Sequence, residues 1–216
     1  MKKVFLTTII LISYLFVLAQ EDEKAIQILN QVSSKTRSFK TIEAEFSFTM
    51  DNNEVDIHEE NEGTIKLKGE KYQVVLPGAG LKIYSDGETI WNYMEDGNQV
   101  TISTIEEGNS DLMNPSSLFS IYEKGFQSKF IEEKKDGNKT LYIIELYPDN
   151  EFQDISKISL AINASTLMID SATLYGTDEN LYGIHVKKME TDKSFADSEF
   201  VFNATEYDDI EIIDFR

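Results

Sequence analysis

Apolar and polar residues alternate along most of this chain. In the clearest segment the apolar positions are Ile42, Ala44, Phe46, Phe48 and Met50, and polar residues stand between them. Successive side chains of a strand point to opposite faces, so this period of two predicts a strand with one wet face and one strongly apolar face. Further strands are predicted at 64–68, 72–76, 81–84, 89–94, 100–104, 126–131, 141–147, 155–162, 167–175 and 181–189, with a polar turn or a frayed hairpin at 51–62 and edge pieces at 199–202 and 210–215.

Short turns connect these strands. Asp86-Gly87 and Asp136-Gly137 are hairpin signals, because glycine accepts the positive φ that tight turns need. Strands joined by short turns run antiparallel, and about ten or more twisted strands in succession tend to curl. The pattern therefore predicts a mostly β protein with some helix, whose core is an incomplete, unclosed antiparallel β-barrel of roughly eleven strands.

Two segments have helical spacing instead. Near residue 25, Ala25, Ile28, Leu29 and Val32 recur at i, i+3, i+4 and i+7, which predicts an amphipathic N-terminal helix that covers part of the sheet. Further along, an asparagine–proline pair at 114–115 can begin a short internal helix. Its bulky apolar residues are Leu118, Phe119 and Tyr122.

Residues 1–19 have the pattern of a secretory signal peptide. Lys2 and Lys3 precede an apolar run that ends in the small-residue cleavage pattern Val17-Leu18-Ala19. The run is shorter than the about 20 residues that a membrane span needs, which argues against the alternative of a membrane anchor. We expect cleavage after Ala19, which leaves residues 20–216 as a single exported domain.

Charge and chemistry narrow the function. The formal net charge is −19, and an acidic surface is repelled by nucleic acid and by anionic lipid headgroups. There is no cysteine, and His58 and His185 lack ligand spacing, so we expect no metal. The sequence has no phosphate loop, dinucleotide fingerprint or nucleophile elbow, so we expect no cofactor and no enzyme activity. A glycosidase-like carboxylate pair stays open as an alternative, since carboxylates are abundant.

The remaining signal is apolar surface on a curved sheet. We expect one concave face to hold Phe46, Phe48, Ile65, Leu67, Tyr72, Val74, Leu76, Trp91 and Tyr93. The internal helix would face it with Leu118, Phe119 and Tyr122. These side chains either line a cavity or fill an ordinary core, and periodicity alone favours the core.

The order of the segments resembles the periplasmic outer-membrane lipoprotein carrier family, the LolA-like proteins. The family's opening is similar to the N-terminal helix followed by the strand residues 44–49. Its second pair of strands resembles residues 63–67 and 71–72, and the most similar part of the chain is residues 86–93 with 98–100. Asn114-Pro115 with Leu118-Phe119 is similar to the family's internal lid helix, and the ends at 200–202 and 214–216 also fit. The resemblance covers residues 23–216, and only the ordered set of segments is specific.

The resemblance implies a function in transport. Such proteins bind the acyl chains of lipoproteins in a hydrophobic cavity and shuttle lipoproteins through the periplasm from the inner to the outer membrane. The implied partners are acylated lipoproteins, an inner-membrane ABC lipoprotein exporter and an outer-membrane acceptor, and we expect a monomer. In better-known members an arginine after the second strand ties the lid shut. Here Gly69-Glu70-Lys71 occupies that region, which leaves Lys71 as a poorer substitute.

Three other functions stay open. The family also includes lipid- or lipoprotein-sensing regulatory domains of the same fold. An exported hydrolase would need two carboxylates facing each other across a polar cleft. An inert binding or structural module would have a filled core.

Overall fold

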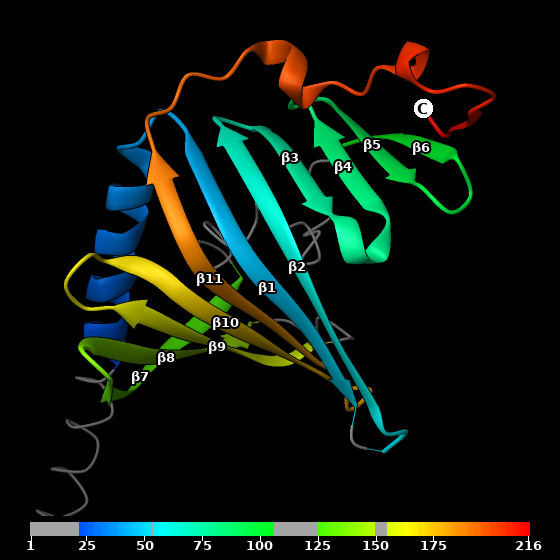
Figure 1. The fold of residues 1–216 in the computed structure, drawn as a ribbon. Helices are drawn as coiled ribbons and strands as arrows, with labels where there is room; N and C mark the ends of the chain where they lie inside the picture. Colours follow the sequence, from blue (N-terminus) through cyan, green and yellow to red (C-terminus); the bar gives the residue numbers. More distant parts are fainter. Residues whose placement is uncertain (1–21, 53, 106–124, 150–154) are drawn as a thin grey trace, which may run out of the picture.

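The computed structural model describes residues 22–52, 54–105, 125–149 and 155–216. These residues form a 12-stranded sheet whose strands follow the order β12-β6-β5-β4-β3-β2-β1-β11-β10-β9-β8-β7. The strands are β1 (Ile42–Asn52), β2 (Ile57–Lys68), β3 (Lys71–Leu76), β4 (Leu81–Ser85), β5 (Thr89–Met94), β6 (Gln99–Thr104), β7 (Phe126–Asp136), β8 (Lys139–Pro148), β9 (Ile155–Asn163), β10 (Met168–Gly176), β11 (Leu181–Thr191) and β12 (Glu211–Asp214). β7 and β12 are the two free edges, so the strongly curved sheet is not closed (Figure 1).

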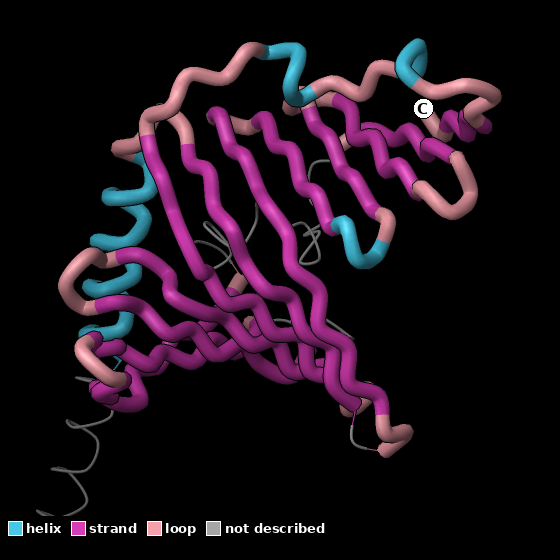
Figure 2. Tube along the Cα trace, viewed as in Figure 1, coloured by secondary structure: helices cyan, strands magenta, loops and turns pink. Residues whose placement is uncertain are grey.

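The N-terminal helix spans residues 22–37 and lies along one end of the sheet (Figure 2). Its predicted apolar stripe is buried in the main core: Ala25 and Val32 are fully buried, and Ile28 and Leu29 nearly so. They pack with strand residues from both halves of the curved sheet, among them Ile144 of β8. The amphipathic spacing therefore predicted both the helix and the face that it buries.

Both glycine hairpin signals are confirmed. Gly87 (φ +96°) turns β4 into β5, and Gly137 (φ +56°) turns β7 into β8. The Asp86 carboxylate accepts hydrogen bonds from the backbone N–H groups of Glu88 and Thr89, which fixes the first turn locally. L side chains rarely adopt positive φ angles, so glycine is favoured at both positions, and most strongly at Gly87, whose φ exceeds that of every described non-glycine residue.

One local prediction was confirmed in one of its two forms, and two others were wrong. The polar segment 51–62, expected as a turn or a frayed hairpin, belongs to a hairpin, in which residues 57–62 form the first half of β2 and pair with β1 from Asn52↔Ile57 to Ser47↔Glu62. The expected edge strand at 199–202 is instead partly a short 3₁₀ helix, Asp197–Phe200. The last edge piece does form β12, but it pairs with β6 in parallel, whereas the other pairings between described strands are antiparallel.

Two predictions fall on residues that the structure does not describe. The signal peptide at 1–19 and the internal helix with Leu118, Phe119 and Tyr122 both lie outside the described ranges. Within those ranges, no helix is long and apolar enough to cross a membrane.

Candidate functional site

The concave face of the sheet carries the apolar positions of β1 in register with those of its neighbours. On one side, Ala44 pairs with Ile65 of β2, which pairs with Val74 of β3 and then Ile83 of β4. On the other side, Phe48 pairs with Ile184 of β11, which in turn pairs with Ala172 of β10. Directly paired residues share a face of the sheet, so one apolar surface runs without interruption through the middle of the curve.

Most residues predicted to line a cavity lie on this surface. Phe46, Ile65, Leu67, Tyr72 and Val74 are buried members of the main core, and Phe48 and Leu76 are partly exposed and pack against them. Other partly exposed residues of the same surface are Ile83, Leu174, Ile184, Val186 and Met189. Along this surface the burial of the apolar side chains therefore decreases. They are buried where they pack with the helix residues, and they are partly accessible farther away.

Two aromatic residues of β1 show why the surface has this shape. Phe46 lies across from Gly63, and a Cβ added at Gly63 would stand 2.7 Å from the tip of the Phe46 ring and 2.6 Å from Leu76. The tip of the ring therefore approaches backbone that only glycine leaves bare. Two residues on, the Phe48 ring stacks on Tyr182 at a centroid distance of 6.3 Å. Phe46 is structural, whereas Phe48 presents a partly accessible ring.

Trp91 and Tyr93 do not belong to this surface, and that prediction was wrong. Trp91 pairs with Tyr84, which pairs with Gln73, and Gln73 pairs with Lys66. This line of cross-strand neighbours lies on the convex face, because Lys66 alternates with the inner residues of β2. The Tyr93 ring packs there against Phe202 and Tyr207, at centroid distances of 5.4 and 4.4 Å.

A second hydrophobic cluster results on the outer face. Its buried members are Tyr93, Val100, Ile102 and Phe202, and Trp91 packs at its margin. The C-terminal segment supplies Phe202 after the chain has crossed the ends of the strands (Figure 1). The two aromatic residues of β5 therefore fasten the C-terminal segment and leave the concave face to other side chains.

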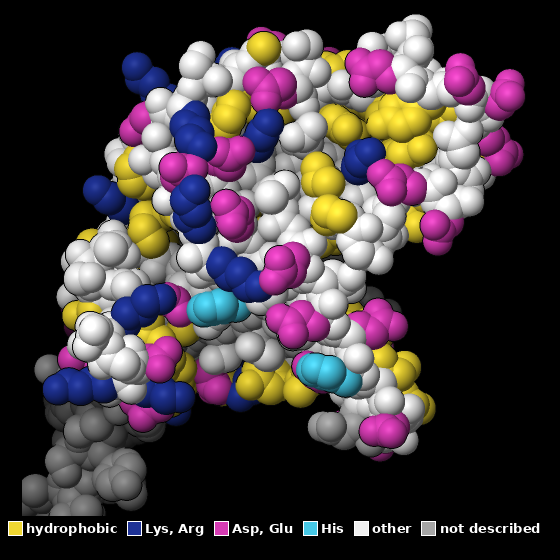
Figure 3. All heavy atoms as spheres, in the orientation of Figure 1, with side chains coloured by type: hydrophobic (Ala, Val, Ile, Leu, Met, Phe, Trp, Pro, Cys, Tyr) yellow, Lys and Arg dark blue, Asp and Glu magenta, His cyan; other side chains and the backbone are white. Residues whose placement is uncertain are grey.

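Charged side chains gather on the outer face, where acidic and basic groups lie side by side (Figure 3). Asp197 of the C-terminal segment accepts hydrogen bonds from the ammonium groups of Lys68 and Lys71, at 2.7 and 2.9 Å. These two lysines hold the pKa of Asp197 at about 2. The ammonium of Lys66 likewise contacts Glu199 at 2.7 Å. Lys71 thus binds the C-terminal segment on the convex face, where it cannot tie down anything lying over the concave one.

Sequence reasoning missed half of the apolar surface. Strands β8 to β11 contribute Ile144, Leu160, Ala172 and Ile184, which follow one another across the sheet in register. Their period-two spacing is readable in the sequence. What assigns them to the same face as Phe48 is the long-range pairing of β1 with β11, and no local pattern shows that pairing.

Within the described residues, no group of three or more acidic, histidine or cysteine side chains could hold a metal ion. His185 lies 3.8 Å from Asp170, and His58 contacts Asp51 at the far end of β1. Described residues beside the N-terminal helix line one pocket of about 750 Å³ and another of about 470 Å³. The larger lies between the helix and the start of β7, and the smaller between the helix end, β10 and β11.

Comparison with known proteins identifies the family. A model of the outer membrane lipoprotein carrier protein LolA matches residues 37–203. No curated protein matches the chain. Among solved structures, an uncharacterized conserved protein from Thermus thermophilus has 12% identity and a TM-score of 0.56, covering 88% of this chain and 99% of that one.

Two further structures are weaker matches. The LolA superfamily protein NE2245 from Nitrosomonas europaea has 12% identity and a TM-score of 0.45, over 82% of this chain and 97% of that one. The Mycobacterium tuberculosis lipoprotein LppX has 9% identity and a TM-score of 0.46, over 81% and 98%. The family match spans both the curved sheet and its concave surface, and the chain belongs to the LolA family of outer membrane lipoprotein carrier proteins.

Proposed function

We propose that this protein is a periplasmic carrier that binds lipoprotein acyl chains on its concave apolar surface and shuttles lipoproteins from the inner to the outer membrane. The observation that carries the proposal is the group of partly exposed apolar side chains on the inner face of an unclosed sheet, among them Phe48, Ile83 and Ile184. Apolar side chains that remain accessible on a concave surface are typical of sites for apolar ligands.

Energetics favour a carrier of this shape. Each methylene group removed from water is worth about 0.8 kcal/mol, so an acyl chain with about 15 of them is worth on the order of 12 kcal/mol. Three such chains would exceed the practical ceiling of about 20 kcal/mol for non-covalent binding. A carrier must therefore shield the chains and still release them, which an open sheet with a partly accessible face allows.

The distribution of charge also suits a carrier. The described ion pairs of β1 to β4, such as Lys66–Glu199 and Lys82–Glu95, involve outer-face side chains. The inward-facing positions of the same strands are mostly apolar, and Glu59, which pairs with Met50 near the far end of β2, is a charged exception. With a net charge of −19, the protein is repelled by anionic headgroups, so it should dock on a membrane through a partner protein rather than on the lipid itself.

A pair of matched substitutions tests the proposal. Ile184→Asp places a charge on the concave surface, whereas Ile131→Asp makes the same change on β7 at a residue that is 40% exposed. We expect Ile184→Asp to abolish binding of a fluorescent fatty acyl probe and Ile131→Asp to leave it unchanged. Circular dichroism and urea unfolding check that both variants fold. Unchanged probe binding by folded Ile184→Asp would refute an acyl site on this face.

Capture from the periplasm tests delivery. Native mass spectrometry of the protein, exported by its own residues 1–19 and purified without detergent, should find acylated lipoproteins bound. Crosslinking in cells should join the protein to an inner-membrane ABC exporter and to an outer-membrane acceptor. Recovery of a regulatory membrane protein in their place, with no lipoprotein, would contradict delivery and indicate a sensor.

A further inference from the structure

The wall of the sheet is split between β10 and β11. The two strands pair only from Ser171↔His185 to Tyr175↔Leu181. Beyond that point Met168 and Ile169 of β10 pair only with β9, while residues 186 and 188–191 of β11 pair only with β1. The diverging strands are visible in Figure 1, where β11 turns away from β10.

Two β-bulges lie where the split begins. Asp170 is the extra residue of β10, between Ile169 and Ser171, and Lys187 is the extra residue of β11, between Val186 and Lys188. Bulges bend strands and end their pairing. Asp170 is nearly buried, and the Lys139 ammonium donates a hydrogen bond to it at 2.6 Å, which fixes the bend of β10. The split is therefore built into the strands.

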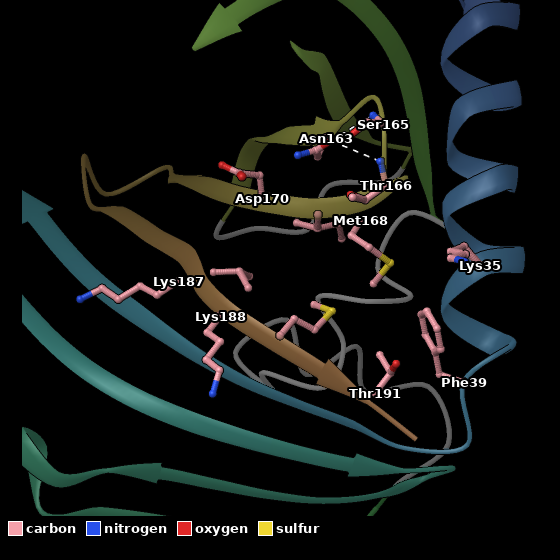
Figure 4. Close-up of a pocket in the computed structure, with 13 residues that line it drawn as sticks. Lys35, Phe39, Asn163, Ser165, Thr166, Met168, Asp170, Lys187, Lys188 and Thr191 are labelled. Atoms are coloured by element: carbon pink, nitrogen blue, oxygen red, sulfur yellow. Dashed lines mark hydrogen bonds between the residues drawn. The ribbon is translucent and has the colours of Figure 1, made fainter. Parts of the chain in front are cut away.

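The pocket of about 470 Å³ occupies this split. A volume of that size is within the range of small-molecule sites. Figure 4 shows Lys35 and Phe39 on the side of the N-terminal helix, and Met168 and Thr191 on the side of the sheet. Its apolar lining is Phe39, Met168, Ile169, Val186 and Met189. Val186 and Met189 also belong to the concave face, because they pair with Phe46 and Ala44, so the pocket leads from the surface of the protein to that face.

One cation faces the pocket without an anionic partner among residues 22–52, 54–105, 125–149 and 155–216. The Lys35 ammonium lies 5.3 Å from the centre of the Phe39 ring, and no described carboxylate forms an ion pair with it. Lys187 and Lys188 also line the pocket, but they point away from Lys35 in Figure 4 and pair with Glu62 and Glu190. Flexible methionine walls beside a single cation fit an aliphatic chain with a negative head.

We propose that the split between β10 and β11 binds a single-chain anionic amphiphile. Its anionic head contacts Lys35 at the outer mouth, and its chain runs past Met168 and Met189 toward Val186. A carboxylate and a phosphate monoester share this chemistry. This site adds a class of ligand to the proposed carrier function. It rests on that function because it requires that acyl chains reach the concave face.

The test compares cis-parinaric acid, a fluorescent fatty acid, with its neutral methyl ester. Lys35→Gln should weaken binding of the acid by about three- to fivefold, as expected for one exposed charge pair, and leave the ester unchanged. Lys40→Gln makes the same change of charge at an exposed residue that does not line the pocket, and it should change neither. Met168→Gln should weaken both ligands equally, because it alters the chain site. Dodecanoate and lauroyl lysophosphatidate, as competitors, show which head is preferred.

The outcomes separate this site from the carrier function. If the unaltered protein binds neither probe, the proposed function fails together with the site. If it binds both, and Lys35→Gln leaves the ratio of the two affinities unchanged, only the site at the split is overturned. A diazirine-labelled fatty acid should crosslink within residues 163–170 or 186–191, and labelling confined to other segments would also overturn it.

Discussion

Phe46 and Phe48 offer a sharp test of whether the concave face is a core or a ligand surface. They lie two residues apart on the same strand and the same face, but Phe46 is 5% exposed, whereas Phe48 is partly accessible. Phe46→Ala should lower the free energy of unfolding by about 3–5 kcal/mol, the usual cost for a buried phenylalanine. Phe48→Ala should cost less, since it loses mainly its stacking on Tyr182, worth about 1 kcal/mol, and part of its buried area.

Binding should follow the opposite order. If the Phe48 ring shields about two methylene groups of a bound chain, its loss costs about 1.6 kcal/mol, or about 15-fold in affinity. Urea unfolding followed by Trp91 fluorescence gives the stabilities, and titration with a fluorescent acyl probe gives the affinities. The reasoning is refuted if the two variants lose equal stability and Phe48→Ala binds the probe as tightly as the unaltered protein does.

Three other predictions concern the packing of Phe46 and the attachment of the C-terminal segment to the convex face. Gly63→Val should displace the Phe46 ring and lower both stability and probe affinity, whereas a variant that retains both would show that the close approach is unimportant. Asp197, with its pKa lowered to about 2, stabilises the attached C-terminal segment above about pH 4, and this contribution is lost as the pH falls toward 2. In Asp197→Asn the difference in Trp91 fluorescence between pH 4 and 2 should shrink, and an identical acid response would contradict this. Phe202→Ala should cost about 3 kcal/mol and speed hydrogen exchange of the C-terminal segment, with probe binding unchanged because it lies on the opposite face.

Local signals predicted the elements of this fold well. The alternation in β1, the apolar stripe of the N-terminal helix and the glycine turns at 87 and 137 depend on residues close together in the chain, and all three are confirmed. The polar half of β2, expected as a turn or a frayed hairpin, could not be assigned more closely for the opposite reason. Its sequence, with Glu59, Glu60 and Glu62, gives no strand signal, and it is extended because β1 supplies its hydrogen-bond partners.

The face of each strand depends on register, which explains the error at Trp91. A strand pattern tells which residues share a face but not which face is the inner one. A signal was available: counting back through the hairpins sets Trp91 opposite Tyr84, Tyr84 opposite Gln73, and Gln73 opposite Lys66. Because this series of paired residues ends at the charged Lys66, it indicates the face of the sheet that is exposed to solvent. The pairing of β1 with β11 has no such local marker, because more than a hundred residues separate them.

The two halves of the sheet are stabilised from opposite sides, and this arrangement explains how the middle can stay partly open. At β5 and β6 the inner positions are mixed, with Ile90 opposite Ser103 and Asn92 opposite Thr101, and the aromatic cluster of Tyr93 and Phe202 lies outside. At β7 to β10 the N-terminal helix covers the inner face, and Ile144 is fully buried beneath it. Each half therefore has its own buried cluster. The main core also fills the concave side of β1 to β3, where Ile65 and Val74 are buried. The side chains left to meet a ligand are therefore the partly exposed ones beyond that core, such as Phe48, Ile83 and Ile184.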